Sequence, residues 1–204
     1  MSGLEIRPLG PDRLADFLGY FDRDAFADNP WWAGCFCNFY ESLTHPAENP
    51  DPTTPAFVPF RDHNRAEKAG RIRAGKAQGF LAYRDGKVVG WLNAQPKAAY
   101  ANPRQFAPAF ATIPDRTGVL MCFIVAPDHR AQGVGTALLA AALDGFRAAG
   151  LEYAQGFARR PGAPLGEWET FATSSYHGTH SMYLESGFGE VGTVGSYAVM
   201  RRSL

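Results

Sequence analysis

The feature that most constrains the fold is an apolar run that leads directly into a glycine-rich turn. Residues 119–125 are Val-Leu-Met-Cys-Phe-Ile-Val and lie between Gly118 and Pro127. A run of this length is typical of a central strand buried on both faces, although periodicity alone also fits a short buried helix. We interpret it as a strand.

A helix is predicted directly after the turn. The i, i+3, i+4, i+7 spacing of one apolar helix face is present at Leu139, Ala142, Leu143 and Phe146. Gly150 is placed to end this helix. The turn itself is Arg-Ala-Gln-Gly-Val-Gly at 130–135. Gly133 and Gly135 leave backbone N–H groups uncovered at the helix N-terminus, where unpaired donors and the helix dipole attract a phosphate or pyrophosphate.

The string Arg-x-x-Gly-x-Gly alone is weak evidence, because the chain contains 22 Gly. A dinucleotide fingerprint would need Gly where Leu138 stands, and a Walker A loop would need Gly-Lys-Ser/Thr, which is absent. The remaining alternative is a tight strand-to-helix turn that binds no ligand.

The order strand, proline-containing turn, Arg-x-x-Gly-x-Gly, helix resembles the acetyl-CoA pyrophosphate site of the GNAT superfamily of N-acetyltransferases. The resemblance implies a single acetyl-CoA-binding domain over residues 1–204. Its α/β fold would have a mixed, mostly antiparallel sheet, flanked by helices, whose central strands four and five splay apart. Acetyl-CoA is then the cosubstrate, and its pantetheine arm enters the gap between these strands.

Site residues follow from the same resemblance. Backbone groups of Phe123, Ile124 and Val125 would bond the pantetheine arm. The pyrophosphate cradle would consist of Gln132, Gly133, Val134, Gly135 and Thr136. Arg130 opens the motif and would orient the turn or neutralise phosphate charge, the alternative being an exposed arginine.

A second matching motif is Tyr-Leu-Glu-Ser-Gly-Phe at 183–188. In the superfamily the helix before the last strands commonly ends in Tyr-x-x-x-Gly-Phe, with the tyrosine hydroxyl near the sulfur of coenzyme A, and Tyr183 matches that position. A tyrosine of pKa about 10 keeps its proton at neutral pH and can protonate a leaving thiolate. The alternative is a core tyrosine with a satisfied hydroxyl.

The chain departs from the superfamily pattern at the general base. Many members place a Glu on the fourth strand, but residues 119–125 contain no carboxylate. The base is therefore supplied elsewhere, for instance by Glu41 or Asp115, or is replaced by a water chain, or is unnecessary for an amine of low pKa.

Other elements agree with the implied topology. Strands are predicted at 4–8, 79–84, 87–92, 153–158, 188–192 and 197–202, and helices at 11–21 and 64–74. Asp85-Gly86 predicts a type I′ hairpin turn. The fifth strand, which follows the long helix, is predicted to lie parallel to the fourth.

Aromatic, proline-rich loops are the candidates for acceptor binding. They are longer than bare connections require, so they either wall a binding site or cover the fold. The side chains that we expect to contact an acceptor are Trp32, Tyr40, Tyr100 and Phe106.

Charge and cysteine content exclude several classes. Lys plus Arg and Asp plus Glu number 20 each, so no nucleic-acid or membrane partner is expected. A cluster of basic residues in one predicted helix is interpreted as a solvated face: Arg61, Arg65, Lys68, Arg71, Arg73 and Lys76. Three cysteines form no disulfide framework, consistent with a cytoplasmic location. We expect their thiols to serve as small, buried apolar side chains.

No metal site is expected. His177 and His180 could share a helix face, but no carboxylate or Cys stands at ligand spacing beside them.

These inferences predict an acyltransferase that moves an acetyl group from acetyl-CoA to an amine of a small molecule, by direct attack in a ternary complex. The alternatives are a non-catalytic acyl-CoA-binding regulatory module and a protein N-terminal or lysine acetyltransferase. Assembly as a homodimer is compatible with either.

Overall fold

The computed structural model of the chain describes residues 3–165 and 175–204. At its centre, these residues form a seven-stranded sheet in the order β1-β2-β3-β4-β5-β7-β6. The strands are β1 (Glu5–Pro8), β2 (Gly79–Arg84), β3 (Lys87–Pro96), β4 (Thr117–Val125), β5 (Tyr153–Arg159), β6 (Gly189–Val194) and β7 (Tyr197–Ser203). All neighbours are antiparallel except β4 and β5, which are parallel. The predicted mixed sheet is confirmed.

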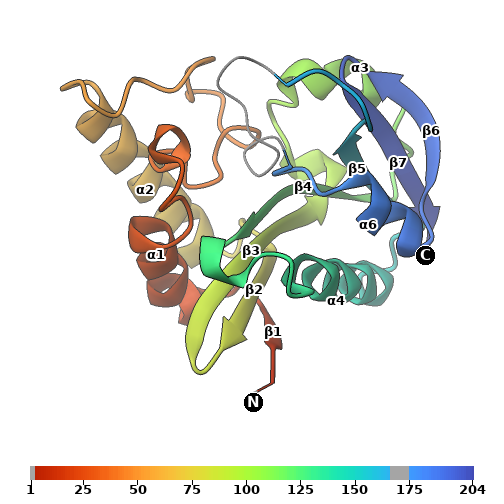
Figure 1. Cartoon of the computed structure of the whole chain (residues 1–204), viewed down its shortest axis with the longest axis horizontal. Coiled ribbons are helices and arrows are strands. Elements are labelled where there is room, and N and C mark those ends of the chain that lie inside the picture. The colour runs from red at the N-terminus through yellow and green to blue at the C-terminus, as the bar shows by residue number, and fades with distance from the viewer. Residues whose placement is uncertain (1–2, 166–174) are drawn as a thin grey trace.

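The central parallel pair forks. β4 and β5 are paired only from Thr117 opposite Tyr153 to Leu120 opposite Gly156. Beyond this point β4 stays with β3 up to Val125, whereas β5 stays with β7 up to Arg159. Figure 1 shows the two halves of the sheet diverging from here. The predicted splay of the fourth and fifth strands is therefore present.

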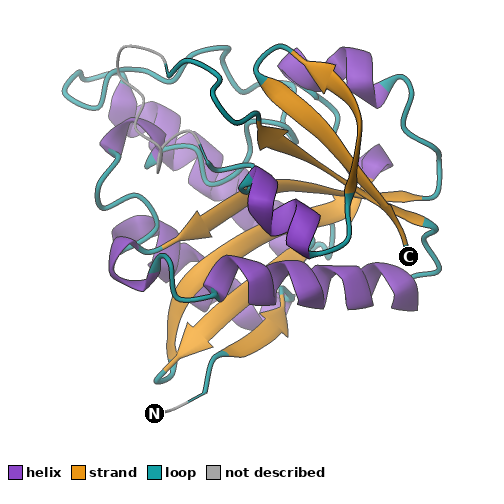
Figure 2. Cartoon of the chain, turned by 45° about the vertical axis from the view of Figure 1, so that its right-hand side comes forward, coloured by secondary structure: helices purple, strands orange, loops and turns teal. Residues whose placement is uncertain are grey.

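Helices cover both faces of the sheet. They are α1 (Leu14–Arg23), α2 (Phe57–Arg73), α3 (Ala107–Phe110), α4 (Val134–Ala148) and α6 (His180–Glu185). The short 3-10 turns are η1 (Pro11–Arg13), η2 (Pro30–Trp32), η3 (Lys97–Ala99), η4 (Arg104–Phe106) and η5 (Pro127–His129). α4 lies across β1 to β4, and α6 contacts β5, as Figure 2 shows. None of the described helices is long and apolar enough to cross a bilayer.

Successive side chains along a strand point to opposite faces of the sheet, so the core is divided into separate clusters. Trp91 of β3 packs into the cluster that contains the α1 and α2 side chains, whereas the next residue, Leu92, packs into the α4 cluster. The hairpin that brings β2 and β3 together turns at Asp85 and Gly86, whose φ angles are 52° and 74°. Positive φ at both positions is the type I′ geometry, as predicted from the Asp-Gly pair.

β4 contains a bulge at Met121. Asn93 of β3 lies opposite Cys122, but the next β3 residue, Ala94, lies opposite Leu120, so Met121 is an extra residue on β4. Met121 and Cys122 consequently pack on the same side of the sheet, in or against the cluster that contains Phe157. Leu120 and Phe123 both face the α4 cluster.

The second helix differs from its prediction in two respects. α2 begins at Phe57, seven residues before the predicted start at 64, because Pro59 lies in the first turn, where a missing N–H costs no helical hydrogen bond. The prediction of a solvated basic face is wrong at Lys68, which is fully buried and donates to Glu41 at 2.8 Å. Arg71 also reaches Glu41, at 2.9 Å.

Candidate active site

A cleft of about 500 Å³ lies between β4, the start of α4 and the segment that leads into α6. We call it the donor cleft. Predicted site residues that line it are Phe123, Val125, Arg130, Gly133, Val134, Gly135 and Thr136. Its opposite wall, which the sequence did not indicate, includes Tyr176, Gly178, Thr179, Ser181 and Met182.

The glycine turn presents bare backbone to the donor cleft. Gly133 is the residue before α4, has a φ of 78°, and provides no side chain to cap the helix. A Cβ atom at Gly133 would meet no other atom within 4 Å, and one at Gly135 would meet only the Met182 sulfur, at 3.5 Å. The uncovered N–H groups and the positive end of the α4 dipole therefore face open space that fits a phosphate group.

Arg130 holds the turn against the end of β4. Its Nε donates to the Val125 carbonyl at 3.0 Å, and its Nη2 donates to Asp28 at 2.9 Å. The hydrogen bond with Asp28 raises the pKa of Arg130. Of the two predicted roles of Arg130, this geometry favours orienting the turn over neutralising phosphate charge. The Gln132 side chain bonds the Asp128 carbonyl at 2.7 Å and does not line the cleft, which leaves its main chain for the cradle.

Successive β4 residues face two different cavities. Phe123 and Val125 line the donor cleft, whereas Cys122 and Ile124 line a second cavity on the other face of the sheet. The side chain of Ile124 is therefore not on the cofactor side, because strand residues alternate. The Phe123 N–H, predicted to bond the pantetheine arm, donates to the Tyr176 carbonyl at 2.6 Å within the chain.

Tyr183 lies at the fork. Its hydroxyl is so close to Gly156, the last β5 residue paired with β4, that a Cβ atom there would overlap it. The side chain is fully buried and its hydroxyl donates to the His177 carbonyl at 2.9 Å. Burial raises the pKa of Tyr183, so the hydroxyl keeps its proton. Gly187 follows α6 with a φ of 79°, the left-handed conformation in which glycine commonly ends a helix.

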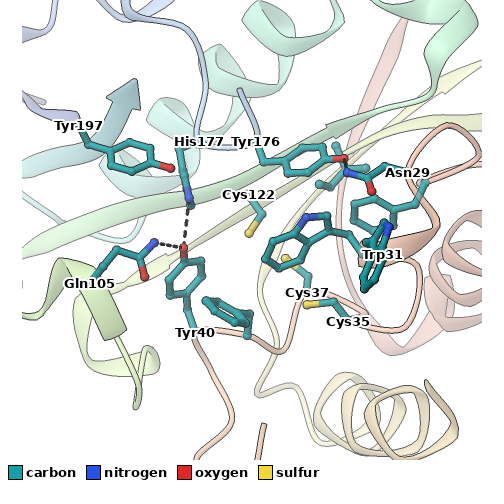
Figure 3. A pocket seen from close by; sticks show the side chains of 14 residues that line it. Asn29, Trp31, Cys35, Cys37, Tyr40, Gln105, Cys122, Tyr176, His177 and Tyr197 are labelled. Atoms are coloured by element: carbon teal, nitrogen blue, oxygen red, sulfur yellow. Dashed lines mark hydrogen bonds between the residues drawn. The ribbon is translucent and has the colours of Figure 1, made fainter. Parts of the chain in front are cut away.

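The second cavity, of about 890 Å³, is lined mainly by aromatic side chains, and we call it the aromatic pocket. Its described lining consists of Phe26, Asn29, Trp31, Trp32, Cys35, Cys37, Phe39, Tyr40, Gln105, Cys122, Ile124, Tyr176, His177 and Tyr197. Figure 3 shows Tyr40, Gln105 and His177 at one end and Asn29, Trp31 and Tyr176 at the other. Tyr176 lines both this pocket and the donor cleft.

A chain of hydrogen bonds runs through the first of these ends. Gln105 Nε2 donates to the Tyr40 oxygen at 2.9 Å, and the Tyr40 oxygen lies 3.1 Å from His177 Nε2. His177 Nδ1 lies 2.6 Å from the Met121 carbonyl, which can only accept, so Nδ1 carries the proton. Nε2 then accepts from the Tyr40 hydroxyl. No sequence pattern indicated this role for His177, because it depends on a contact with the bulge residue Met121.

His177 is neutral at physiological pH. Burial lowers its pKa to about 4, although the bond to Met121 acts in the opposite direction. An uncharged imidazole with a fixed tautomer at the wall of a pocket is a candidate proton acceptor.

Acidification is expected to destabilise the fold through His177. Because its pKa is about 6.5 in an unfolded chain and about 4 in the folded one, the unfolded chain binds more protons between these values. The stabilisation is present above about pH 6.5 and is lost as the pH falls, by about 2 kcal/mol between pH 7 and pH 5. Urea unfolding at both pH values measures this loss. The variant His177→Gln has no titrating ring and should lose about 2 kcal/mol less over the interval; equal losses would assign the effect to other groups.

Neither carboxylate considered as the general base is placed for that role. Glu41 has a fully buried side chain whose oxygens accept from Lys68, Arg71, Asn93 and Gln95, and it does not line the aromatic pocket. Asp115 has a side chain that is 97% exposed and is paired with Lys97 at 2.9 Å on the surface.

The four aromatic residues expected to contact an acceptor fall into two pairs. Trp32 and Tyr40 line the aromatic pocket, so their contact with an acceptor stays a prediction. Tyr100 and Phe106 do not line it and are core residues instead. Phe106 is fully buried and stacks on Phe157 with ring centroids 4.1 Å apart, and the Tyr100 hydroxyl bonds the Val119 carbonyl at 3.0 Å. Both rings bury their apolar surface in a core cluster against β4 and β5.

The three thiols gather at the aromatic pocket. Cys35, Cys37 and Cys122 all line it, as Figure 3 shows, although they come from a loop and a strand far apart in the sequence. Burial raises the pKa of Cys35 to about 12. Within the described ranges, no three His, Cys, Asp or Glu side chains are grouped so that they could hold a metal ion.

Comparison with known proteins identifies the family. The sequence model of the acetyltransferase (GNAT) family matches residues 37–160, which is more than half of the chain. The chain belongs to this family. GNAT enzymes use acetyl-CoA, which is therefore the cosubstrate of this protein. No curated protein matches the chain in sequence.

Solved GNAT structures share the fold at low sequence identity. The PaiA N-acetyltransferase of Thermoplasma acidophilum, in complex with coenzyme A, is 14% identical with a TM-score of 0.54 over 99% of each chain. YncA of Salmonella typhimurium, solved with acetyl-CoA, is 15% identical with a TM-score of 0.51 over 98% of this chain and 94% of that one. The GNAT domain of S. lividans PAT is 14% identical with a TM-score of 0.56, covering 98% and 90%. At these identities the likeness shows the fold alone.

The variant Gly135→Val is expected to weaken acetyl-CoA binding about tenfold or more, because its side chain would stand in front of the α4 N–H groups. The fold should tolerate it, since an added Cβ meets only the Met182 sulfur at 3.5 Å and Val is no worse than Gly in a helix. Isothermal titration calorimetry with acetyl-CoA measures the change. The matched control is Gly70→Val on α2, where an added Cβ meets nothing within 4 Å. An unchanged dissociation constant in Gly135→Val would remove the turn from the cofactor site.

Proposed function

We propose that this GNAT protein transfers the acetyl group of acetyl-CoA to an amine of a small molecule held in the aromatic pocket, by direct attack in a ternary complex. One observation carries the proposal. Two cavities lie on opposite faces of β4 and share Tyr176, beside the point where β4 and β5 part. Such an arrangement can bring a donor from one face and an acceptor from the other into contact.

The chain supplies three kinds of group to this reaction. Acetyl-CoA itself contributes the electrophilic carbonyl carbon and the thiol that leaves. The glycine turn and the α4 N-terminus bind phosphate through main-chain N–H groups. Tyr183, proton-bearing and placed at the fork, is proposed to protonate the departing sulfur. Tyr40 and His177 are proposed to receive the proton that the amine gives up.

The pocket favours a small molecule over a protein acceptor. Aromatic rings that pack edge to face define its walls, with Trp32 5.5 Å from Phe39 and 6.3 Å from Tyr176 between ring centroids. A lined cavity of about 890 Å³ is in the size range of small-molecule sites. The same cavity also speaks against a purely regulatory acyl-CoA-binding module, because such a module needs no acceptor pocket.

Thiol release from acetyl-CoA, followed across a panel of small amines and short peptides, tests the proposal. Release with a small amine and not with peptides is the expected result. Trp32→Ala should raise the KM of the acceptor with little change in the dissociation constant of acetyl-CoA, because it removes binding to one partner only. Binding of acetyl-CoA without release to any acceptor would instead support the regulatory module.

A further inference from the structure

We propose that the acceptor is an aromatic amine that is uncharged at neutral pH, of the arylamine or amino-heteroarene class. Its ring would lie among the aromatic side chains of the pocket, and its amino group would point to Tyr40 and His177. This inference rests on the proposed function of the same site and names its substrate class.

The walls of the aromatic pocket match a planar, uncharged ligand. The described residues that line it include seven Phe, Trp and Tyr side chains and one aliphatic side chain, but no Asp, Glu, Lys or Arg. An ammonium group that enters such a site loses its hydration without gaining a carboxylate, and a carboxylate ligand likewise finds no cation. Aromatic faces and edges, by contrast, complement another aromatic ring.

The fully buried charges of Lys68 and Glu41, beside the pocket residue Cys37, are committed to one another. Both oxygens of Glu41 are occupied, Oε1 by Lys68, Asn93 and Gln95, and Oε2 by Arg71. None of these side chains lines the pocket. The cluster therefore leaves no carboxylate oxygen to hold a protonated amine.

The polar end of the pocket can take a proton from a neutral amine. The hydrogen bonds run in one direction, from Gln105 to Tyr40, from Tyr40 to His177 Nε2, and from His177 Nδ1–H to the Met121 carbonyl. The Tyr40 oxygen still has acceptor capacity for an N–H group. As the nitrogen bonds the acetyl carbon and the C–S bond breaks, the amine proton passes to the Tyr40 oxygen while the Tyr40 proton passes to His177 Nε2. The sulfur keeps the electron pair of the broken bond and receives a proton from Tyr183.

The lowered pKa of His177 suits an uncharged aromatic amine better than a protonated alkylamine. The titratable groups that face it are Tyr40, Tyr197 of β7 and Cys122 of β4, with Tyr183 bonded to its carbonyl. Burial sets its pKa at about 4. An alkylammonium ion of pKa about 10.4 is a weaker acid than such an imidazolium by about six pKa units, so His177 cannot deprotonate it effectively. An arylamine arrives already neutral and becomes a much stronger acid as its nitrogen is acylated.

The test compares 4-methylaniline with 4-methylbenzylamine at saturating acetyl-CoA. The two share a ring and differ in whether the amine is protonated at pH 7. We expect kcat/KM at pH 7 to be about tenfold or more higher for the aniline, and to stay flat for it between pH 6 and pH 9, because neither it nor His177 titrates there. A kcat/KM for the benzylamine equal to or above that of the aniline at pH 7 would overturn the acceptor class and leave acetyl transfer intact. Release with neither amine nor any other acceptor, with acetyl-CoA bound, would overturn the proposed function itself.

A pair of variants tests the role of the polar end. Tyr40→Phe keeps the ring but deletes the hydroxyl between the amine and His177. It should lower kcat for the aniline about tenfold or more, with the dissociation constant of acetyl-CoA unchanged. Tyr83→Phe is the control, because its hydroxyl bonds Asp16 at 2.7 Å, outside both cavities. An unchanged kcat in Tyr40→Phe would remove the proton path from the proposal.

Discussion

Glu41→Ala is expected to destabilise the fold by about 3–5 kcal/mol, because it leaves the ammonium of Lys68 buried without its counter-ion. Lys68 and Glu41 both have fully buried side chains, with Nζ 2.8 Å from Oε1. Asn93 and Gln95 would also lose the oxygen to which they donate, at 2.6 Å and 2.9 Å. A loss of this size is a large fraction of the stability of an ordinary domain. For a chain of this length it corresponds to a fall in Tm of about 10 °C.

Urea unfolding of Glu41→Ala and of a matched surface variant distinguishes the stability cost of breaking a buried ion pair from that of breaking an exposed one. Asp115→Ala breaks a pair of similar length, 2.9 Å to Lys97, but the Asp115 side chain is 97% exposed. It should cost less than about 1 kcal/mol. The double variant Glu41→Leu, Lys68→Met should recover much of the loss, because it removes both charges together. Equal, small effects in Glu41→Ala and Asp115→Ala would show that Lys68 is hydrated or neutral in solution.

Tyr183→Phe is expected to lower the turnover number roughly 10²- to 10⁴-fold, the usual range for a lost proton donor, while acetyl-CoA affinity changes little. The ring packing against Phe123 and Phe188 is retained in this variant. The His177 carbonyl loses its donor, which by itself costs about 1–3 kcal/mol of stability. Steady-state kinetics with the chemical step shown to be rate-limiting, together with thermal unfolding, measures both effects.

Tyr20→Phe is the matched control for this prediction. The Tyr20 hydroxyl is also buried and donates to a main-chain carbonyl of comparable setting, that of Ile124, at 3.0 Å. Neither tyrosine lines a cavity, but Tyr183 lies at the fork against Gly156, whereas Tyr20 packs in the α1 and α2 cluster. If Tyr183 serves only the fold, the two variants should behave alike, with lower stability and an unchanged turnover number. Loss of turnover confined to Tyr183→Phe would support the proton-donor role.

Local signals in the sequence were sufficient to predict the central strand, the glycine turn and the hairpin. The apolar run at 119–125, the glycine turn and the Asp85-Gly86 pair each act within a few residues, and each is found as predicted. The parallel placement of β5 beside β4 also followed from local information, because a helix between two strands imposes a crossover.

The acceptor side could not be predicted in the same way. The partners of Lys68, which are Glu41 and the Cys37 carbonyl, lie 27 and 31 residues away in an irregular segment, so its basic helix looked solvated when considered alone. His177 looked like one of several scattered histidines, because its partner Met121 lies 56 residues earlier in the chain. Aromatic content did not separate Tyr40, which faces the pocket, from Phe106, which is core. These distinctions depend on long-range packing, which composition and periodicity do not record.

The extra residue in β4 determines which cavity each later side chain of that strand faces. Past the bulge, even-numbered positions 122 and 124 line the aromatic pocket and odd-numbered positions 123 and 125 line the donor cleft. A regularly alternating strand that kept all of its residues would exchange these two sets and place Phe123 on the side of the aromatic pocket. With the bulge in place, alternate residues of a single strand line the two cavities. Substitutions at 122 or 124 can therefore retune the choice of acceptor while the recognition of acetyl-CoA is left as it is.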